Sequence, residues 1–223
     1  MTLKCALALF ISSFSALFSA LLAAGHEKHE HEKVAVDVYD AAQVPPLPKD
    51  AQDEWLRKAE NFLSGIKTLK APFIQVTAHT NGVIESRNGL LKWLRPGCVM
   101  FNYNDKPFLQ VIADGEFFVQ KDDDGTSSPI AIENTPAGLI LKEKVDLKKD
   151  AVIHYITEKD AFIIISVANK DDPGSARLIL VFKKSPFSLT QWTIIDTTGR
   201  ITDVVLLNPE MNLPMQKSEF KID

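Results

Sequence analysis

A long series of short segments with a two-residue apolar period restricts the fold of this chain more than any other feature. Pairs of turn-forming residues, such as Asn81-Gly82, Asp114-Gly115 and Thr198-Gly199, separate the segments. Apolar residues at every second position are typical of β-strands, and tight turns favour antiparallel neighbours. The sequence therefore predicts an antiparallel meander that curls into a barrel or half-barrel. The expected strands are 71–80, 84–94, 99–103, 108–114, 116–121, 130–132, 152–158, 161–168, 177–183, 189–196, 201–207 and 219–222.

One helix is expected before the strands and a second, shorter one between them. Residues 50–67 carry apolar side chains at steps of three and four, which indicates one stripe of an amphipathic helix. Residues 135–141 are a short apolar segment with Pro136 near its start, where the first turn of a helix tolerates proline. We expect this segment to form a short helix over the sheet or across the barrel mouth.

Two of the expected strands are apolar on both faces. Residues 162–165 and 178–182 show no alternation between apolar and polar side chains. A sheet with one face in water has such alternation, so both faces of these strands must be covered. We expect the helix over 50–67 to cover one face and the barrel interior to lie against the other. Small closed barrels fill their interior and wider ones leave a cavity, and the residues alone leave both possibilities open.

The first 24 residues have the layout of a secretory signal peptide. Lys4 precedes an uncharged apolar run, and the small residues Ala23-Ala24 end it. An uncleaved membrane anchor is the alternative, because about 18 apolar residues can just span a bilayer. Residues 25–50 are rich in charge, histidine and proline, which predicts a disordered tail before one domain over 51–223. A secreted chain would keep the single cysteine Cys98, and therefore no internal disulfide.

The sequence offers little chemistry. It has no Gly-x-Ser-x-Gly elbow, phosphate loop, dinucleotide glycine pattern or Cys-x-x-Cys pair. His26, His29 and His31 lack the spacing of a zincin helix. The net charge of −4 gives no reason to expect nucleic-acid binding. We therefore predict no enzyme activity, no cofactor, no metal site and no nucleic-acid partner.

The role of the polar residue Arg95 has two possible interpretations. It follows an apolar strand and precedes Pro96-Gly97, so it is either a surface arginine at a strand end or a donor aimed at a neighbouring segment. A guanidinium presents several N–H donors in a fixed geometry. The C-terminal end of a helix leaves carbonyl groups unpaired. An arginine at the rim of a barrel could therefore hold a covering helix in place.

Five segments follow one another in a specific order and spacing: 66–75, 89–103 with its Arg95-Pro96-Gly97 corner, 112–115, 135–140 and 189–202. Together they resemble the LolA-like family of periplasmic outer-membrane lipoprotein carriers, from about residue 51 to the end of the chain. The resemblance implies an incomplete antiparallel β-barrel with an N-terminal helix and a short helical lid over an apolar cavity for acyl chains. It implies a monomeric chaperone in the periplasm of a Gram-negative bacterium. Its expected partners are acylated lipoproteins, an inner-membrane lipoprotein-releasing ABC transporter and an outer-membrane acceptor.

The resemblance also implies roles for individual residues. Arg95 matches the arginine that holds the lid of the empty carrier closed, and Leu139 and Ile140 match the lid helix. Val99 stands where several relatives have phenylalanine, which would reshape the mouth of the cavity. The expected acyl-chain site consists of Phe73, Trp93, Val99, Phe101, Phe118, Leu139, Ile140, Phe182 and Trp192. A lipid- or lipoprotein-sensing regulatory protein on the same half-barrel is the alternative function.

Overall fold

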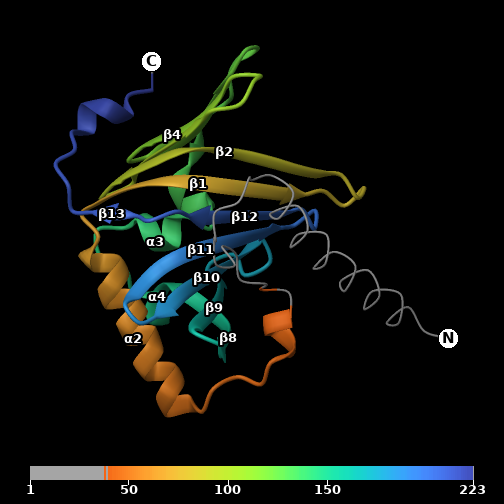
Figure 1. Cartoon of the computed structure of the whole chain (residues 1–223), viewed down its shortest axis with the longest axis vertical. Helices are drawn as coiled ribbons and strands as arrows, with labels where there is room; N and C mark the ends of the chain where they lie inside the picture. Colours follow the sequence, from red (N-terminus) through yellow and green to blue (C-terminus); the bar gives the residue numbers. More distant parts are fainter. Residues whose placement is uncertain (1–37, 39, 223) are drawn as a thin grey trace, which may run out of the picture.

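The structure, a computed structural model, describes residue 38 and residues 40–222 of the 223-residue chain (Figure 1). The predicted signal peptide, 1–24, and the histidines of the predicted tail lie outside the described residues. The helices and 3-10 turns (η) are η1 (Asp40–Gln43), α2 (Lys49–Gly65), η2 (Ile132–Asn134), α3 (Gly138–Leu141), α4 (Leu147–Asp150) and η3 (Lys217–Phe220). None of the helices in this part is long and apolar enough to span a membrane.

The described strands form one antiparallel sheet that does not close on itself. Its order is β6-β5-β4-β3-β2-β1-β12-β11-β10-β9-β8, with β13 added to β1 and β7 added to β5. This arrangement confirms the predicted incomplete barrel. The strands are β1 (Thr68–Ala78), β2 (Ile84–Leu94), β3 (Cys98–Tyr103), β4 (Leu109–Asp114), β5 (Phe117–Asp122), β6 (Gly125–Thr126), β7 (Ile130–Ala131), β8 (Ala151–Lys159), β9 (Phe162–Asn169), β10 (Ala176–Lys184), β11 (Phe187–Asp196), β12 (Ile201–Leu206) and β13 (Glu210–Met211).

The concave, inner face of the sheet holds the main hydrophobic core. Leu56, Ala59 and Leu63 of α2 pack into this core, so α2 lies on the inner side. The short helix α3 packs there as well, and Figure 1 shows it inside the curve of the sheet. The prediction was that the first helix covers one face of the sheet and that the barrel interior lies against the other face. It is wrong, because α2 packs in the same inner core as α3.

Two other segments cover the convex, outer face. Before α2, Val38 and Ala41 pack on Ile164, Ile179 and Val181 of β9 and β10. This contact explains why those strands are apolar on both faces: α2 and α3 cover the inner face and the segment before α2 covers the outer one. Part of the predicted tail is therefore packed, and α2 begins at Lys49. The predicted boundaries of the signal peptide and the domain otherwise remain predictions.

The segment after β13 covers the other half of the outer face. Phe220 is buried against Cys98, Met100, Ile112 and Val119 of β3, β4 and β5. The expected strand at 219–222 is wrong, because this segment forms the 3-10 turn η3 instead. A capping box between Gln216 and Glu219 stabilises the turn and directs Phe220 onto the sheet. Burial here also raises the pKa of the Cys98 thiol, as expected for a packing residue.

Candidate functional site

A segment between β7 and β8 covers the inner face of the sheet. We call residues 132–150 the lid segment; it contains η2, α3 and α4. All four residues of α3 are buried, with Leu139 and Ile140 3% and 5% exposed. Gly138 begins α3 at a close contact, since a Cβ there would lie 2.6 Å from the carbonyl oxygen of Ile132. The predicted short helix over the sheet is thus present, three residues later than its expected start.

Arg95 joins the lid segment to the end of α2. Its Nε donates to the carbonyl oxygen of Ile66 at 3.0 Å, and its Nη2 donates to that of Leu63 at 2.7 Å. Its Nη1 donates to the carbonyl oxygen of Lys142, the residue that ends α3. These acceptors lie at the C-terminal ends of α2 and α3, where carbonyl groups lack partners within the helix; that of Leu63 also accepts from the N–H of Ile66. Of the two interpretations of Arg95, the second therefore applies in the structure: the side chain donates hydrogen bonds to neighbouring segments.

The surroundings of Arg95 fix its side chain and shield it from solvent. The side chain is 7% exposed, and burial lowers the pKa of the guanidinium to about 10, against a smaller opposite effect of Glu143. Its Cζ atom lies 5.2 Å from the ring centre of Trp93, which is two residues earlier, near the end of β2. Three hydrogen bonds to carbonyl groups compensate the cost of burying this charge. Arg95 is therefore a fixed donor at the rim of the half-barrel.

The turn after Arg95 contributes a second connection to the lid segment, besides the hydrogen bond from Arg95 to Lys142. The backbone N–H of Gly97 donates to the carbonyl oxygen of Leu141 at 2.9 Å. Gly97 has a φ of 72°, and a Cβ there would lie 2.7 Å from the Cα of Gly115 in the next hairpin turn. Only glycine fits both conditions. The turn therefore fixes Arg95 and the Gly97 N–H as one unit facing the C-terminal end of α3.

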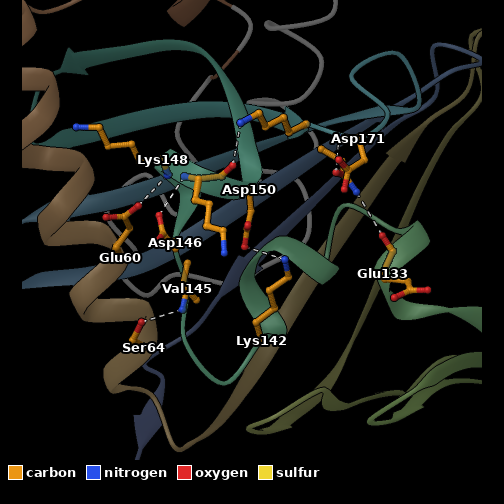
Figure 2. Close-up of polar contacts among 12 residues, drawn as sticks. Glu60, Ser64, Glu133, Lys142, Val145, Asp146, Lys148, Asp150 and Asp171 are labelled. Atoms are coloured by element: carbon orange, nitrogen blue, oxygen red, sulfur yellow. Dashed lines mark hydrogen bonds and ion pairs between the residues drawn. The ribbon is translucent and has the colours of Figure 1, made fainter.

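A second set of polar contacts holds the lid segment beyond α3 (Figure 2). The backbone N–H of Val145 donates to Ser64 Oγ at 3.1 Å, and that of Lys148 donates to Glu60 Oε1 at 3.0 Å. Both acceptors project from α2. The Nζ of Lys142 lies 2.8 Å from Asp150 Oδ2. The lid segment after α3 is therefore attached to α2, and this attachment has no counterpart in the sequence pattern, since serine and glutamate are ordinary residues on the polar side of a helix.

At its other end the lid segment is tied to the sheet. Asn169 Nδ2, at the end of β9, donates to the carbonyl oxygen of Glu133 at 3.3 Å, a contact that Figure 2 also shows. The N–H of Ile132 donates to the carbonyl oxygen of Glu116 at 2.9 Å. The segment therefore has two polar ends, and α3 lies between them.

The structure brings all nine residues of the expected acyl-chain site together in or against the core under the lid segment. Phe101 is the centre of their aromatic contacts, at 5.3 Å from Phe73 and 6.2 Å from Trp192 between ring centres. Phe101 and Phe118 are partly exposed, whereas the other members are buried: Phe73, Trp93, Val99, Leu139, Ile140, Phe182 and Trp192. Their part in binding acyl chains remains a prediction.

The interior is packed in this conformation. Side chains of α2, α3 and the following residues Val145 and Leu147 fill the space against the sheet. Two small pockets, of about 190 and 230 Å³, open beside His154 on the edge strand β8, and neither is lined by α3. The expected apolar cavity therefore coincides with the space that the lid segment occupies here.

The inner face continues beyond the cover of the lid segment. Tyr103 lies next to Phe73 and Phe101, at 5.2 and 6.5 Å between ring centres. Its hydroxyl donates to Gln75 Oε1 at 2.7 Å, and burial raises its pKa to about 12. On β7, Ile130 is 55% exposed opposite Phe118. Tyr103 thus has a polar partner beside the aromatic cluster, and Ile130 is an accessible apolar residue at another place on this face, level with Val99 in the sheet register. The alternation of apolar residues on β3 in the sequence could have placed Tyr103 on the inner face. Its hydrogen bond with Gln75 could not have been found in this way, because it depends on how β1, β2 and β3 are aligned in the sheet.

Comparison with known proteins assigns the chain to a family. The family described as "Outer membrane lipoprotein carrier protein LolA" matches residues 64–223, which include Arg95 and the lid segment. The outer-membrane lipoprotein carrier protein of Methylobacillus flagellatus is 22% identical over 183 residues, 78% of this chain and 87% of that protein.

Solved structures include a LolA superfamily protein from Nitrosomonas europaea, at 9% identity and a TM-score of 0.46 over 76% of this chain and 97% of that one. A DUF1329 family protein from Desulfovibrio piger has 8% identity and a TM-score of 0.48, over 77% and 96% of the two chains. Because the family match spans well over half of the sequence, this chain belongs to the LolA family of outer-membrane lipoprotein carrier proteins.

Proposed function

We propose that this protein is a periplasmic chaperone that holds the acyl chains of lipoproteins on the inner face of its half-barrel. The observation that carries the proposal is Arg95, which joins α3 to α2 across an apolar surface through main-chain hydrogen bonds. Opening this junction would remove α3 and expose the aromatic residues beneath it. The family match supports lipoproteins as the cargo.

Cargo would replace α3 rather than enter an empty space. A chain of about 16 carbons gains about 12 kcal/mol on burial, at about 0.8 kcal/mol per methylene. Removing Leu139, Ile140 and Leu141 from the core costs about 1.5–3 kcal/mol for each side chain. The two terms partly cancel, so cargo binds with much less free energy than its apolar surface would give alone. A carrier needs this, because it must release what it binds.

Arg95 would set the balance between the closed and open states. A ligand shifts such a balance only by its different affinity for the two states. Acyl chains and α3 compete for the same face, so hydrogen bonds that hold α3 also favour release of cargo. The protein would collect lipoproteins from an inner-membrane ABC transporter and transfer them to an acceptor at the outer membrane, without any catalytic step.

Native mass spectrometry of the protein with one lipoprotein in acylated and deacylated form tests the proposal. We expect a one-to-one complex with the acylated form and none with the deacylated form. Equal binding of both forms would place the site on a protein surface instead. Absence of any complex would contradict the carrier function.

A sensing regulator would also bind acylated lipoproteins, so a second assay separates it from a carrier. We expect the protein to stimulate release of newly made lipoproteins from spheroplasts and to recover them in solution as soluble complexes. A regulator would bind without stimulating release.

A further inference from the structure

We propose that the indole N–H of Trp93 donates a hydrogen bond to a carbonyl oxygen of the lipid part of the cargo. The inference rests on the proposed function. It adds one polar contact, which would recognise the linkage of the acyl chain, to a site that is otherwise apolar. Trp93 would then distinguish chains attached through ester or amide groups from hydrocarbon or ether-linked chains of the same length.

Trp93 is a buried donor without an acceptor. The residue is 1% exposed and belongs to the core under the lid segment. Its Nε1 atom is buried and has no hydrogen-bond partner among the described residues. Nearly all buried polar groups in proteins are paired, and a buried indole N–H normally finds an acceptor. An unpaired donor at this place therefore needs an explanation beyond packing, which phenylalanine would supply as well.

The position of Trp93 places this donor where cargo would lie. In the sheet register Trp93 lies between Leu69 on β1 and Val99 on β3, and all three side chains belong to the inner core. Leu139 and Ile140 of α3 belong to the same core. In the proposed arrangement, movement of α3 uncovers the indole together with the apolar surface around it.

The neighbour of Trp93 makes an oxygen acceptor the complementary chemistry. Arg95 is 5.2 Å from the Trp93 ring and has only donors to offer, so it cannot pair with the indole N–H. When the carbonyl oxygen of Lys142 leaves with α3, a donor of Arg95 also loses its partner. Two neighbouring residues then each have a donor without an acceptor. The carbonyl oxygens of ester and amide linkages are acceptors at the head of acyl chains, and an ether oxygen is a weaker substitute.

The indole resonance of Trp93 in an 15N–1H NMR spectrum provides the direct test. The probes are a synthetic lipopeptide with two ester-linked C16 chains and its ether-linked analogue of the same length. We expect the Trp93 N–H proton to move downfield with the ester form and to remain near its original position with the ether form. Variants Trp93→Phe and Trp192→Phe assign the resonance, and the measurement itself uses the unaltered protein.

Affinities supply the second test. We expect the unaltered protein to bind the ester form about tenfold more tightly than the ether form, which corresponds to about 1.4 kcal/mol. Trp93→Phe keeps the ring and removes the N–H, so the ratio should fall to about one. Trp55→Phe is the control for loss of an indole, because Trp55 lies on α2 outside the expected acyl-chain site, and it should leave the ratio unchanged.

The outcomes separate the two proposals. If both lipopeptides bind with equal affinity and the Trp93 resonance responds equally to them, the inference about Trp93 is wrong while the carrier function stands. If neither lipopeptide binds, the carrier function fails and the inference fails with it. An ester preference that persists in Trp93→Phe would also overturn the role of Trp93.

Discussion

The inner and outer faces of this sheet are both apolar and both covered, but they are covered in different ways. Hydrophobic side chains of two separate segments, one before α2 and one after β13, seal the outer face. The inner face is sealed by a segment between two strands whose four-residue helix is held through main-chain carbonyls and one arginine. So short a helix has no stability of its own and depends on these contacts. The comparison indicates that the outer cover stabilises the fold and that the inner cover is the one able to move.

The largest effect should follow from weakening the outer cover. Phe220→Ala removes a fully buried ring and should lower the free energy of unfolding by about 3–5 kcal/mol. Denaturant unfolding measures the loss, and Phe117→Ala, at a 42% exposed site, should cost much less. Where Phe220→Ala remains folded, cargo transfer should be normal. A transfer defect there would remove the distinction between the two covers.

Arg95→Leu should open the inner cover. The lid segment loses one charge-assisted hydrogen bond, worth about 1.5–3 kcal/mol, and α2 loses two. We expect the variant to bind acylated cargo and to pass it on at least tenfold more slowly, because α3 no longer competes for the face. Transfer of labelled lipoprotein to outer membranes gives the rate. Arg87→Leu is the control, since Arg87 lies on β2 and donates to the carbonyl oxygen of Pro107 instead. Transfer at the normal rate by Arg95→Leu would refute the competition between α3 and cargo.

Gly138→Ala should disturb α3 without touching Arg95. The added methyl would lie 2.6 Å from the carbonyl oxygen of Ile132, so α3 must shift, at a cost of about 1–3 kcal/mol. Hydrogen exchange of the α3 amides should become faster while exchange in β9 and β10 stays slow. Gly174→Ala, where nothing lies within 4 Å of the added carbon, should change neither. Faster exchange throughout the sheet would mean that the inner cover is part of the folding core.

Ser64→Ala should produce the smallest effect and identify the hinge. It removes the acceptor for the Val145 N–H, at a cost of about 0.5–1.5 kcal/mol. If the part of the lid segment after α3 stays fixed while α3 moves, cargo affinity should hardly change and the exchange of the Val145 amide should increase. Ser175→Ala, in the turn before β10 and outside the lid segment, controls for loss of a hydroxyl. A change in cargo affinity as large as that of Arg95→Leu would show that the whole segment opens.

The strands were predictable because their pattern is local. β2 was expected at its observed bounds, and most other strands within a few residues, since a two-residue period and a turn are visible in the sequence itself. The strand at 219–222 was wrong because two apolar residues two positions apart, Phe220 and Ile222, have the period of a strand although this segment forms a 3-10 turn. Val38 and Ala41 were assigned to a tail because composition averages over many residues and hides two apolar ones.

The site was predictable only in part, for a physical reason. Arg95 stands at a strand end before Pro96, so a donor role was one of two readings available from the sequence, and the structure decides between them. Whether the interior is filled depends on how the volume of α3 matches the curvature of the sheet, which no pattern encodes. The unpaired Nε1 of Trp93 is a property of the packed core and has no trace in the sequence.

The packed interior has a consequence for the kinds of molecule that the protein does not bind. Because α3 is tethered at both ends, it competes for the inner face at an effective concentration that a free ligand in dilute solution does not reach. A small apolar molecule such as a free fatty acid would have to gain more free energy on binding than this competition by α3 costs. Two or three linked acyl chains exceed this cost together. If the protein is the carrier proposed above, the lid segment would therefore act as a filter for multiply acylated cargo, and the empty carrier would present no large apolar surface on which other proteins could aggregate.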